Sequence, residues 1–468
     1  MELKIRNPKH VEFITFLKDK IKSTAFNGHV FLVGGYVRDC LLGREPNDID
    51  IAIDIPNGGV GFSMWLAYNT GCFVNGSNPV IFNNFGTAKL SLNKMEKFSD
   101  IEVEFVQTRK EQYHKENRNP STVFGSIDED ASRRDFTINA LYYDITNDKI
   151  LDPTKKGIED LKKHIIRSCG EPNVIFEEDP LRIIRAVRFS TQLGWPIEKN
   201  TWVGMISNVK RVGILSQERV TDELNKILLS KRPSDGIRKM LSCGVLNAVL
   251  PSISEYRAIF QTPQAKYTLY DHTLNTLDKT KPILINRLGA LFHDLGKLFT
   301  YEKKFLYHSA IGADKAKELL IAMKYSKDLA NKVSCIIEHH EDFSCFTNSV
   351  IPGNARIRKF SSYFDDEDTL MSALDVINAD ATAQYYTKKP KLVPNILRKI
   401  REMKERGEDI NKVILPINGN DIMAEFNVKK GPIIGTLLEE VKKEVLENPS
   451  LSKEGAFSVI EKYLKKVV

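Results

Sequence analysis

Two aspartates stand two residues apart in the stretch NDIDIAIDIP, residues 47–56. Asp48 and Asp50 alternate with isoleucines, so an extended chain places both carboxylates on one face and the apolar side chains on the other. Like charges on one face repel each other unless a cation lies between them. We therefore predict one wall of a metal site here; the alternative is an exposed edge strand whose acids face water. Asp54 is interpreted as a turn residue.

A third carboxylate is available on a second predicted strand, DIEVEFV, where Glu102 and Glu104 share one face. Two aspartates and one such glutamate form a hard-oxygen site of the kind that Mg²⁺ prefers. In nucleotidyl transfer, one ion at such a site activates an attacking hydroxyl and another holds the triphosphate. The acidic residues therefore predict a magnesium site for nucleotide chemistry.

A glycine pair lies ahead of the first of these strands. The apolar run VFLV ends in Gly34 and Gly35, and a predicted helix begins about Tyr36. A turn of this kind lets backbone amides approach phosphate oxygens, and Arg38 can add a charged contact. An ordinary turn is the alternative reading of the glycines alone.

The segment SRRDFTINALYYD supplies cations for a triphosphate. Arg133 and Arg134 can grip phosphate oxygens bidentately, and Asn139 can bond a ribose hydroxyl. Asp135 is expected to tie the backbone of this motif together. The polar stretch 108–130 ahead of it is expected to be a mobile loop.

Composition limits the class of protein. The 468 residues are 42% hydrophobic and 28% charged, with no apolar run near the roughly 18 residues of a membrane span. Six cysteines without a C-x-x-C pair argue against a zinc ribbon and a disulfide framework. The first residues lack the apolar core of a signal peptide, so we expect a cytoplasmic protein with no membrane association. A net charge of +7 is compatible with a polyanionic partner.

Five motifs follow one another between about residues 29 and 250: LVGGYVRDCLLGREPNDIDIAI, RRDFTINAL, LDPTKKGIEDL, EEDPLRIIRAVRF and ERVTDELNKIL. Their order and spacing resemble the class II (bacterial and eukaryotic) tRNA nucleotidyltransferase and poly(A) polymerase family. The resemblance implies addition of C, C and A to the tRNA 3′ end, with the acceptor stem, CTP and ATP as partners. It makes Asp48 and Asp50 the catalytic ligands of Mg²⁺ and favours Glu104 over Glu102 as the third acid.

The same resemblance assigns the choice of base to the motif EEDPLRIIRAVRF. Asp179 precedes a predicted helix and Arg182 lies one turn on, so their side chains are expected on one face. Together they offer an acceptor and donors that can imitate a Watson–Crick edge. Glu178 opens the E-D-x-x-R pattern, and Arg185 continues the basic face. The alternative is a helix-start acid in an ordinary ion pair.

Five of the nine histidines fall in one helical region, where RLGALFHDLGKLF places a His-Asp pair at a helix end. The order of motifs there resembles an HD-family metal phosphohydrolase domain. That resemblance implies a divalent transition metal, or Mg²⁺, bound by His272, His293, Asp294 and Asp380, with His308, His339 and His340 as candidates for a second metal position or a phosphate contact. The alternative is an HD fold that serves only as a scaffold.

The fold class implied is an α/β, DNA polymerase β-like nucleotidyltransferase head followed by mostly α-helical neck, HD and tail domains. Strand-like runs mix with helical ones in the head, and apolar spacings of three and four prevail beyond it. The predicted boundaries are 1–150, 151–255, 256–390 and 391–468. Competing functions are a poly(A) polymerase, an enzyme adding only C or only A, a phosphohydrolase in which the HD domain is primary, and an RNA-binding module with an inert head.

Overall fold

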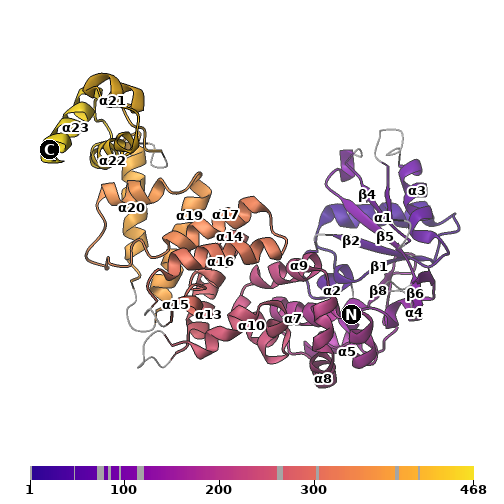
Figure 1. Ribbon diagram of the computed structural model, residues 1–468. Helices are drawn as coiled ribbons and strands as arrows, with labels where there is room; N and C mark the ends of the chain where they lie inside the picture. The colour runs from indigo at the N-terminus through magenta and orange to yellow at the C-terminus, as the bar shows by residue number, and fades with distance from the viewer. Residues whose placement is uncertain are drawn as a thin grey trace. The chain divides into compact units, whose positions relative to one another are not determined.

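The computed structural model describes residues 3–46, 48–70, 78–82, 86–93, 96–112, 121–260, 267–301, 305–384, 389–408 and 412–467. The chain divides into two compact units, Met1–Leu215 with Cys243–Val245, and Ser216–Ser242 with Leu246–Val468. The first contains the strands and the second is helical (Figure 1). The α/β head with a helical remainder is therefore confirmed, whereas the finer four-part division stays a prediction.

The first unit holds all the strands of the described chain. Its strands are β1 Val30–Val33, β2 Ile49–Ile53, β3 Val80–Phe82, β4 Thr87–Ser91, β5 Glu102–Gln107, β6 Arg109–Gln112, β7 Ser121–Phe124, β8 Tyr142–Asp144 and β9 Lys149–Leu151. Its helices are α1 Pro8–Ile21, α2 Gly35–Leu41, α3 Gly58–Asn69, α4 Ile127–Ser132, α5 Gly157–Lys163, α6 Pro172–Glu178, α7 Leu181–Leu193 and α8 Lys199–Asn208, with 3₁₀ turns η2 Glu96–Phe98, η3 Thr137–Asn139 and η4 Val209–Ile214.

Seven strands form one mixed sheet in the order β3-β4-β5-β2-β1-β8-β9. β2 and β5 run parallel at its centre, and the other neighbours are antiparallel. The isoleucines of β2 are buried, as their alternation with acids predicted. The expectation of a loop over 108–130 is wrong for its described part, where β6 pairs with β7 and α4 follows; residues 113–120 lie outside the described chain.

The second unit is built from helices. They are α9 Gln217–Leu228, α10 Pro233–Ser242, α11 Val245–Val249, α12 Pro251–Glu255, α13 Leu269–Lys279, α14 Leu284–Phe292, α15 Lys297–Thr300, α16 His308–Ala322, α17 Lys327–His339, α18 Asn354–Ser361, α19 Glu367–Ala383, α20 Leu392–Glu405, α21 Gly419–Phe426, α22 Pro432–Glu447 and α23 Lys453–Val467, with the 3₁₀ turn η5 Tyr256–Ala258. Helices α21 to α23 share a small apolar core of their own. None of the described helices has both the length and the apolar run needed to cross a membrane.

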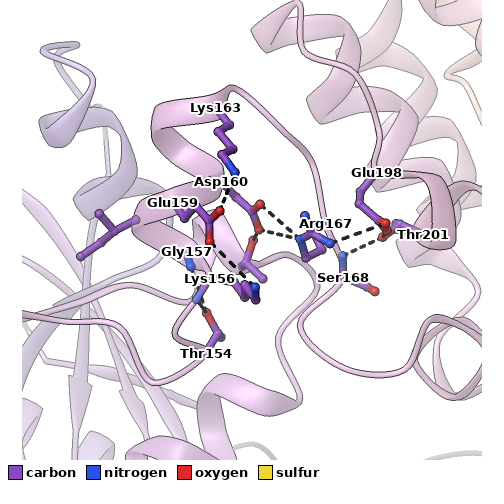
Figure 2. A network of polar contacts seen from close by, with 12 residues as sticks. Thr154, Lys156, Gly157, Glu159, Asp160, Lys163, Arg167, Ser168, Glu198 and Thr201 are labelled. Atoms are coloured by element: carbon purple, nitrogen blue, oxygen red, sulfur yellow. Dashed lines mark hydrogen bonds and ion pairs between the residues drawn. The ribbon is translucent and has the colours of Figure 1, made fainter.

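The LDPTKKGIEDL motif forms a polar network around Asp160 and Arg167 (Figure 2). The buried carboxylate of Asp160 accepts a hydrogen bond from Thr137 Oγ1 at 2.8 Å, and Arg167 Nε lies 3.0 Å from Asp160 Oδ2. Gly157 lets α5 approach closely, because a Cβ there would lie 2.6 Å from the Thr137 carbonyl oxygen. Since η3 ends at Asn139, the network positions a residue predicted to contact the nucleotide.

Replacement of Asp160 by Asn should destabilise the first unit, because it removes the charge that pairs with Arg167 in a buried site. We expect a loss of about 2–3 kcal/mol in the free energy of unfolding, measured by urea denaturation. Glu159→Gln is the matched control on the same turn, since its ion pairs with Lys156 and Lys163 are exposed to solvent. Equal stability of the two variants would contradict a structural role for Asp160.

Candidate functional site

Two carboxylates face each other across the central parallel strands. Asp50 of β2 is the register partner of Glu104 of β5, so both side chains leave the sheet on the same face at the same level. Asp50 is half-buried, while Glu104 and Asp48 are exposed. The predicted acids therefore gather at one place in the sheet.

Geometry distinguishes the two glutamates of β5. Glu102 is ion-paired with Lys89 of β4 at 2.7 Å. Glu104 is level with Asp50, and its charge raises the pKa of that aspartate. Geometry therefore favours Glu104 as the partner of Asp50, although its catalytic role stays a prediction.

The acid pair is electrostatically unfavourable on its own. Burial, and next the charge of Glu104, raise the pKa of Asp50 to about 6; Arg134 opposes this and Asp48 adds to it. A cation between the carboxylates would relieve the repulsion. The donor set of two aspartates and a glutamate on one face thus fits a divalent metal with a preference for oxygen ligands.

The predicted phosphate turn lies beside these acids. Gly34 links β1 to α2 with φ of 68°, a conformation that favours glycine. A Cβ at Gly34 would lie 3.4 Å from Asp50 Oδ2 and 3.6 Å from Arg134 Nη1. The turn therefore brings the acidic strand and the RRD motif together, and Gly35 begins α2 directly after it.

Two other predicted residues contact each other. The Arg38 guanidinium donates from Nη1 to Asn139 Oδ1 at 2.7 Å, and its Nε and Nη2 bind the carboxylate of Asp39 at 2.9 and 2.7 Å. Asn139 in turn donates to Asp135 Oδ1 at 3.2 Å. Arg38 therefore ties α2 to η3 in this structure, and its predicted contact with a triphosphate stays untested.

The two arginines of the RRD motif share a carboxylate that the sequence analysis missed. Asp130 accepts from Arg133 Nε at 3.0 Å and Nη2 at 2.5 Å through Oδ1, and from Arg134 Nε at 3.0 Å through Oδ2. Burial raises the pKa of Asp130, but the guanidinium groups of Arg134 and Arg133 outweigh it and hold the pKa below its ordinary value. The missed signal is an acid in a short helix, three and four residues before an arginine pair that follows the helix end.

The base-selecting motif begins as expected, with Asp179 just before the helix that carries Arg182. Asp179 is the C-cap of α6, and its carboxylate accepts from the Leu181 amide at 3.2 Å, at the start of α7. Arg182 is buried, and its Nη2 donates to the Arg133 carbonyl at 2.7 Å. The Asp179 carbonyl accepts from the Arg182 amide at 3.0 Å, so the two residues are one turn apart as expected, and a shared face for their side chains stays a prediction.

The remaining residues of that motif also contact the head. Glu178 Oε2 lies 3.6 Å from Arg182 Nη1. Arg185 Nε and Nη2 both bind Asp135 Oδ2, at 2.8 and 2.5 Å. Asp135 also accepts from the Phe136 amide at 2.8 Å, as its expected backbone role requires. Helix α7 is thereby fixed to the RRDFTINAL segment.

A second cluster forms in the helical unit. His272 Nε2 of α13 lies 2.9 Å from Asp380 Oδ1 of α19 and 3.2 Å from His293 Nε2. His293 Nε2 lies 3.3 Å from Asp294 Oδ2. The four predicted ligands therefore converge from three parts of the chain, and the two histidines and Asp294 are almost wholly buried.

A second set of imidazoles approaches the other oxygen of Asp294. His308 Nε2 lies 3.4 Å and His340 Nε2 lies 3.7 Å from Asp294 Oδ1. Among the described residues, Asp294 Oδ1 and His308 Nε2 are buried without a hydrogen bond of good geometry. A cation shared by these atoms would satisfy both, so the residues fit a metal.

The orientation of these imidazoles also suits metal binding. The Nδ1 atoms of His293, His308 and His340 lie 2.8, 2.8 and 2.6 Å from the backbone carbonyl oxygen three residues earlier. A proton on Nδ1 leaves the Nε2 lone pair directed toward Asp294. The backbone thus fixes the tautomer that a metal ligand needs.

Two residues of this region depart from expectation. His339 stacks on Tyr363 with ring centroids 3.8 Å apart and lies 3.4 Å from Asp342, which places it outside the cluster. Lys297, which the sequence analysis did not single out, lies 2.8 Å from Asp294 Oδ2. Burial opposes ionisation of Asp294, but His293 and Lys297 hold its pKa well below the ordinary value. The sequence signal for this ion pair was the three-residue spacing of Asp294 and Lys297 in HDLGK.

Three family models match the chain. "Poly A polymerase head domain" matches residues 30–167, "Probable RNA and SrmB- binding site of polymerase A" matches 194–257, and "tRNA nucleotidyltransferase domain 2 putative" matches 303–454. The mixed sheet, its paired acids and its arginine motif define a nucleotidyltransferase.

Individual proteins are similar to this chain over most of its length. The mitochondrial CCA tRNA nucleotidyltransferase of Candida glabrata is 27% identical, covering 92% of this chain and 90% of that protein. The CC-adding tRNA nucleotidyltransferase of Thermus thermophilus is 25% identical, with 91% and 92% covered. The crystal structure of the Bacillus stearothermophilus CCA-adding enzyme with CTP shares the fold, with a TM-score of 0.69 at 21% identity over 98% of this chain and 99% of that one.

The chain belongs to the class II tRNA nucleotidyltransferase and poly(A) polymerase family. A nucleotidyltransferase of this family depends on a divalent metal ion.

Glu104→Gln should lower nucleotide addition by at least about 100-fold, because it removes a carboxylate level with Asp50. Glu102→Gln, the matched control two residues away, should change it little. Single-turnover addition of a nucleotide to an RNA end measures both. A larger loss with the Glu102 variant would reverse the assignment.

Asp50→Asn should stabilise the metal-free protein at neutral pH. The pKa of Asp50 is raised from 3.8 to about 6 in the folded chain, so stability is lost as the pH rises through this range. In chelator at about pH 7.5 we expect the variant to gain about 1–2 kcal/mol in the free energy of unfolding, with a smaller gain at about pH 4.5. Urea unfolding at both pH values measures the difference. No gain at neutral pH would mean that neither burial nor the neighbouring carboxylates disfavour the charged form of Asp50.

Proposed function

We propose that the protein adds C, C and A to the 3′ end of tRNA, with CTP and ATP as donors and Mg²⁺ as the metal, in the cytoplasm. The observation that carries the proposal is the convergence of Asp50, Glu104 and Arg134 beside the turn at Gly34. Similarity over nine-tenths of the chain to a protein named CCA tRNA nucleotidyltransferase supports it.

Each group in the head has a defined task in this proposal. Asp48, Asp50 and Glu104 would hold the metal, which when bound supplies positive charge for the phosphates and for the attacking hydroxyl. Arg134 Nη1 faces the Gly34 turn and is placed to donate to a triphosphate oxygen. The oxygen of the tRNA 3′ hydroxyl attacks the α-phosphorus and its proton passes to solvent, while the bond from that phosphorus to the bridging oxygen breaks and pyrophosphate leaves.

Selection of the base remains assigned to Asp179 and Arg182 in the proposal, with the RNA following the helices beyond the head. The contact of Arg182 with the Arg133 carbonyl couples the base-selecting helix to the arginines proposed to hold phosphate. Arg38, Arg185 and Asn139 support this coupling through Asp135 and Asp39. A change of base can thereby alter the position of the phosphate-binding groups.

Extension of a trimmed tRNA tests the proposal. A tRNA lacking its last three nucleotides should gain two residues with CTP alone and a third when ATP is added, read on a sequencing gel. Asp48→Ala and Asp50→Ala should each abolish the addition, because the metal loses a ligand.

Other products would contradict the proposal in distinct ways. Long tracts of A would indicate a poly(A) polymerase, and a stop after CC with both nucleotides present would indicate a CC-adding enzyme. No extension by the unchanged protein would favour an RNA-binding module.

A metal-dependent phosphohydrolase is the second function we propose, for the helical unit. It is favoured by the imidazole nitrogens that converge on Asp294 with their Nδ1 atoms bonded to backbone carbonyls. His272 and Asp380 complete the first set of ligands, and His308 and His340 form the second. The resemblance to HD-family domains implies a phosphate ester, such as a 2′,3′-cyclic phosphate, as substrate.

His293→Ala and Asp294→Ala should remove bound transition metal and any hydrolysis of 2′,3′-cyclic AMP, while tRNA extension continues. Metal content per chain, measured by mass spectrometry, gives the direct readout. His339→Ala is the matched control, because His339 lies outside the cluster. Full metal content without His293 or Asp294 would contradict the site.

A further inference from the structure

Asp130 of α4 holds Arg134 in one orientation. Arg134 Nε and Nη2 lie 3.0 and 2.9 Å from the same oxygen, Asp130 Oδ2. The Tyr142 hydroxyl donates to that oxygen at 2.5 Å and accepts from Arg134 Nε at 3.0 Å, while the guanidinium lies over the Tyr142 ring at 5.2 Å. Contacts on one edge and one face of the guanidinium fix its plane.

This orientation leaves the third nitrogen on the opposite side. Arg134 Nη1 makes none of these contacts and lies 3.6 Å from the place where a Cβ on Gly34 would be. Asp50 Oδ2 lies 3.4 Å from that same place. The nitrogen therefore faces the glycine turn next to the acid pair.

The ion pair with Asp130 keeps Arg134 from pairing with Asp50 instead. Arg134 already lowers the pKa of Asp50 through space. Among the described residues, however, no ion pair joins Arg134 to Asp50, because the guanidinium is bound to Asp130. An Arg134 released from Asp130 would be drawn to Asp50 and would neutralise a proposed metal ligand.

We propose that Asp130 is a positioning residue for nucleotide binding. It holds Arg134 side-on, so that Nη1 meets the triphosphate of the incoming nucleotide, and it keeps the guanidinium away from Asp50. The inference rests on the proposed nucleotidyl transfer but concerns a residue outside the predicted motifs. Arg134 would touch the nucleotide, and Asp130 acts only through it.

The test compares binding of CTP and CMP to the full chain by equilibrium dialysis, with EDTA and again with Mg²⁺. Asp130→Asn should lower the ratio of CTP affinity to CMP affinity by about 10- to 100-fold, because only CTP carries the phosphates that Arg134 would bind. Asp128→Asn, an exposed acid on the same helix, should leave the ratio unchanged. A general folding defect would weaken both nucleotides alike, and equal losses would overturn the proposal.

Two further variants separate positioning from structure. In an Arg134→Ala background, Asp130→Asn should lower the ratio by less than about twofold further, because the residue through which it acts is gone. Additive effects would overturn the proposal. Tyr142→Phe removes one donor to Asp130 and should lower the ratio by about two- to fivefold. If Asp130→Asn does not fold, an unchanged ratio in Tyr142→Phe would overturn the proposal.

The proposed function is tested separately in the same experiment. Failure of the unchanged protein to bind CTP under either condition would overturn both proposals. Binding of CTP without extension of trimmed tRNA would overturn the proposed function and leave the positioning role of Asp130 intact.

Discussion

The arrangement of the head depends on two carboxylates that repel each other at one level of the central parallel strands. Asp50 and Glu104 are register partners, and burial first and the charge of Glu104 next raise the pKa of Asp50. Sheet hydrogen bonds impose this arrangement, since strands in this register cannot turn one side chain away without losing their pairing. Gly34, which has no side chain, leaves space beside the acids, and the Arg134 guanidinium next to this turn supplies positive charge.

The arginines near these acids are held in place by ion pairs with other carboxylates. Asp130 binds the RRD arginines, Asp39 binds Arg38, and Asp135 binds Arg185. Each of these arginines is thus paired on one side, which reduces the cost of partial burial and limits its freedom. The helices after the head join the same system through α7, so a change at the nucleotide can reach the segment proposed to select the base.

Much of this was predictable from sequence, for identifiable reasons. The alternation in NDIDIAIDIP predicted β2 and the face of its acids, because strand periodicity is local. Asp130 was missed because Arg133 and Arg134 follow the end of its helix, and its third partner, Tyr142, lies on β8. The helix start after Asp179 was predictable from the sequence, because α6 ends at Glu178 and α7 begins at Leu181, whereas the shared face of Asp179 and Arg182 stays a prediction. In the helical unit, the predicted ligands converged except His339, whose neighbour His340 points the other way around the helix end.

The central claim is that Asp50 and Glu104 share a divalent cation when a nucleotide is bound. Crystals grown with CTP and Mn²⁺, measured at the manganese absorption edge, would locate the ion directly by its anomalous scattering. The account predicts a peak between the carboxylates of Asp50 and Glu104, with Asp48 beside it and the triphosphate at the Gly34 turn. A peak bound by the triphosphate alone, with Glu104 directed away from Asp50, would contradict it.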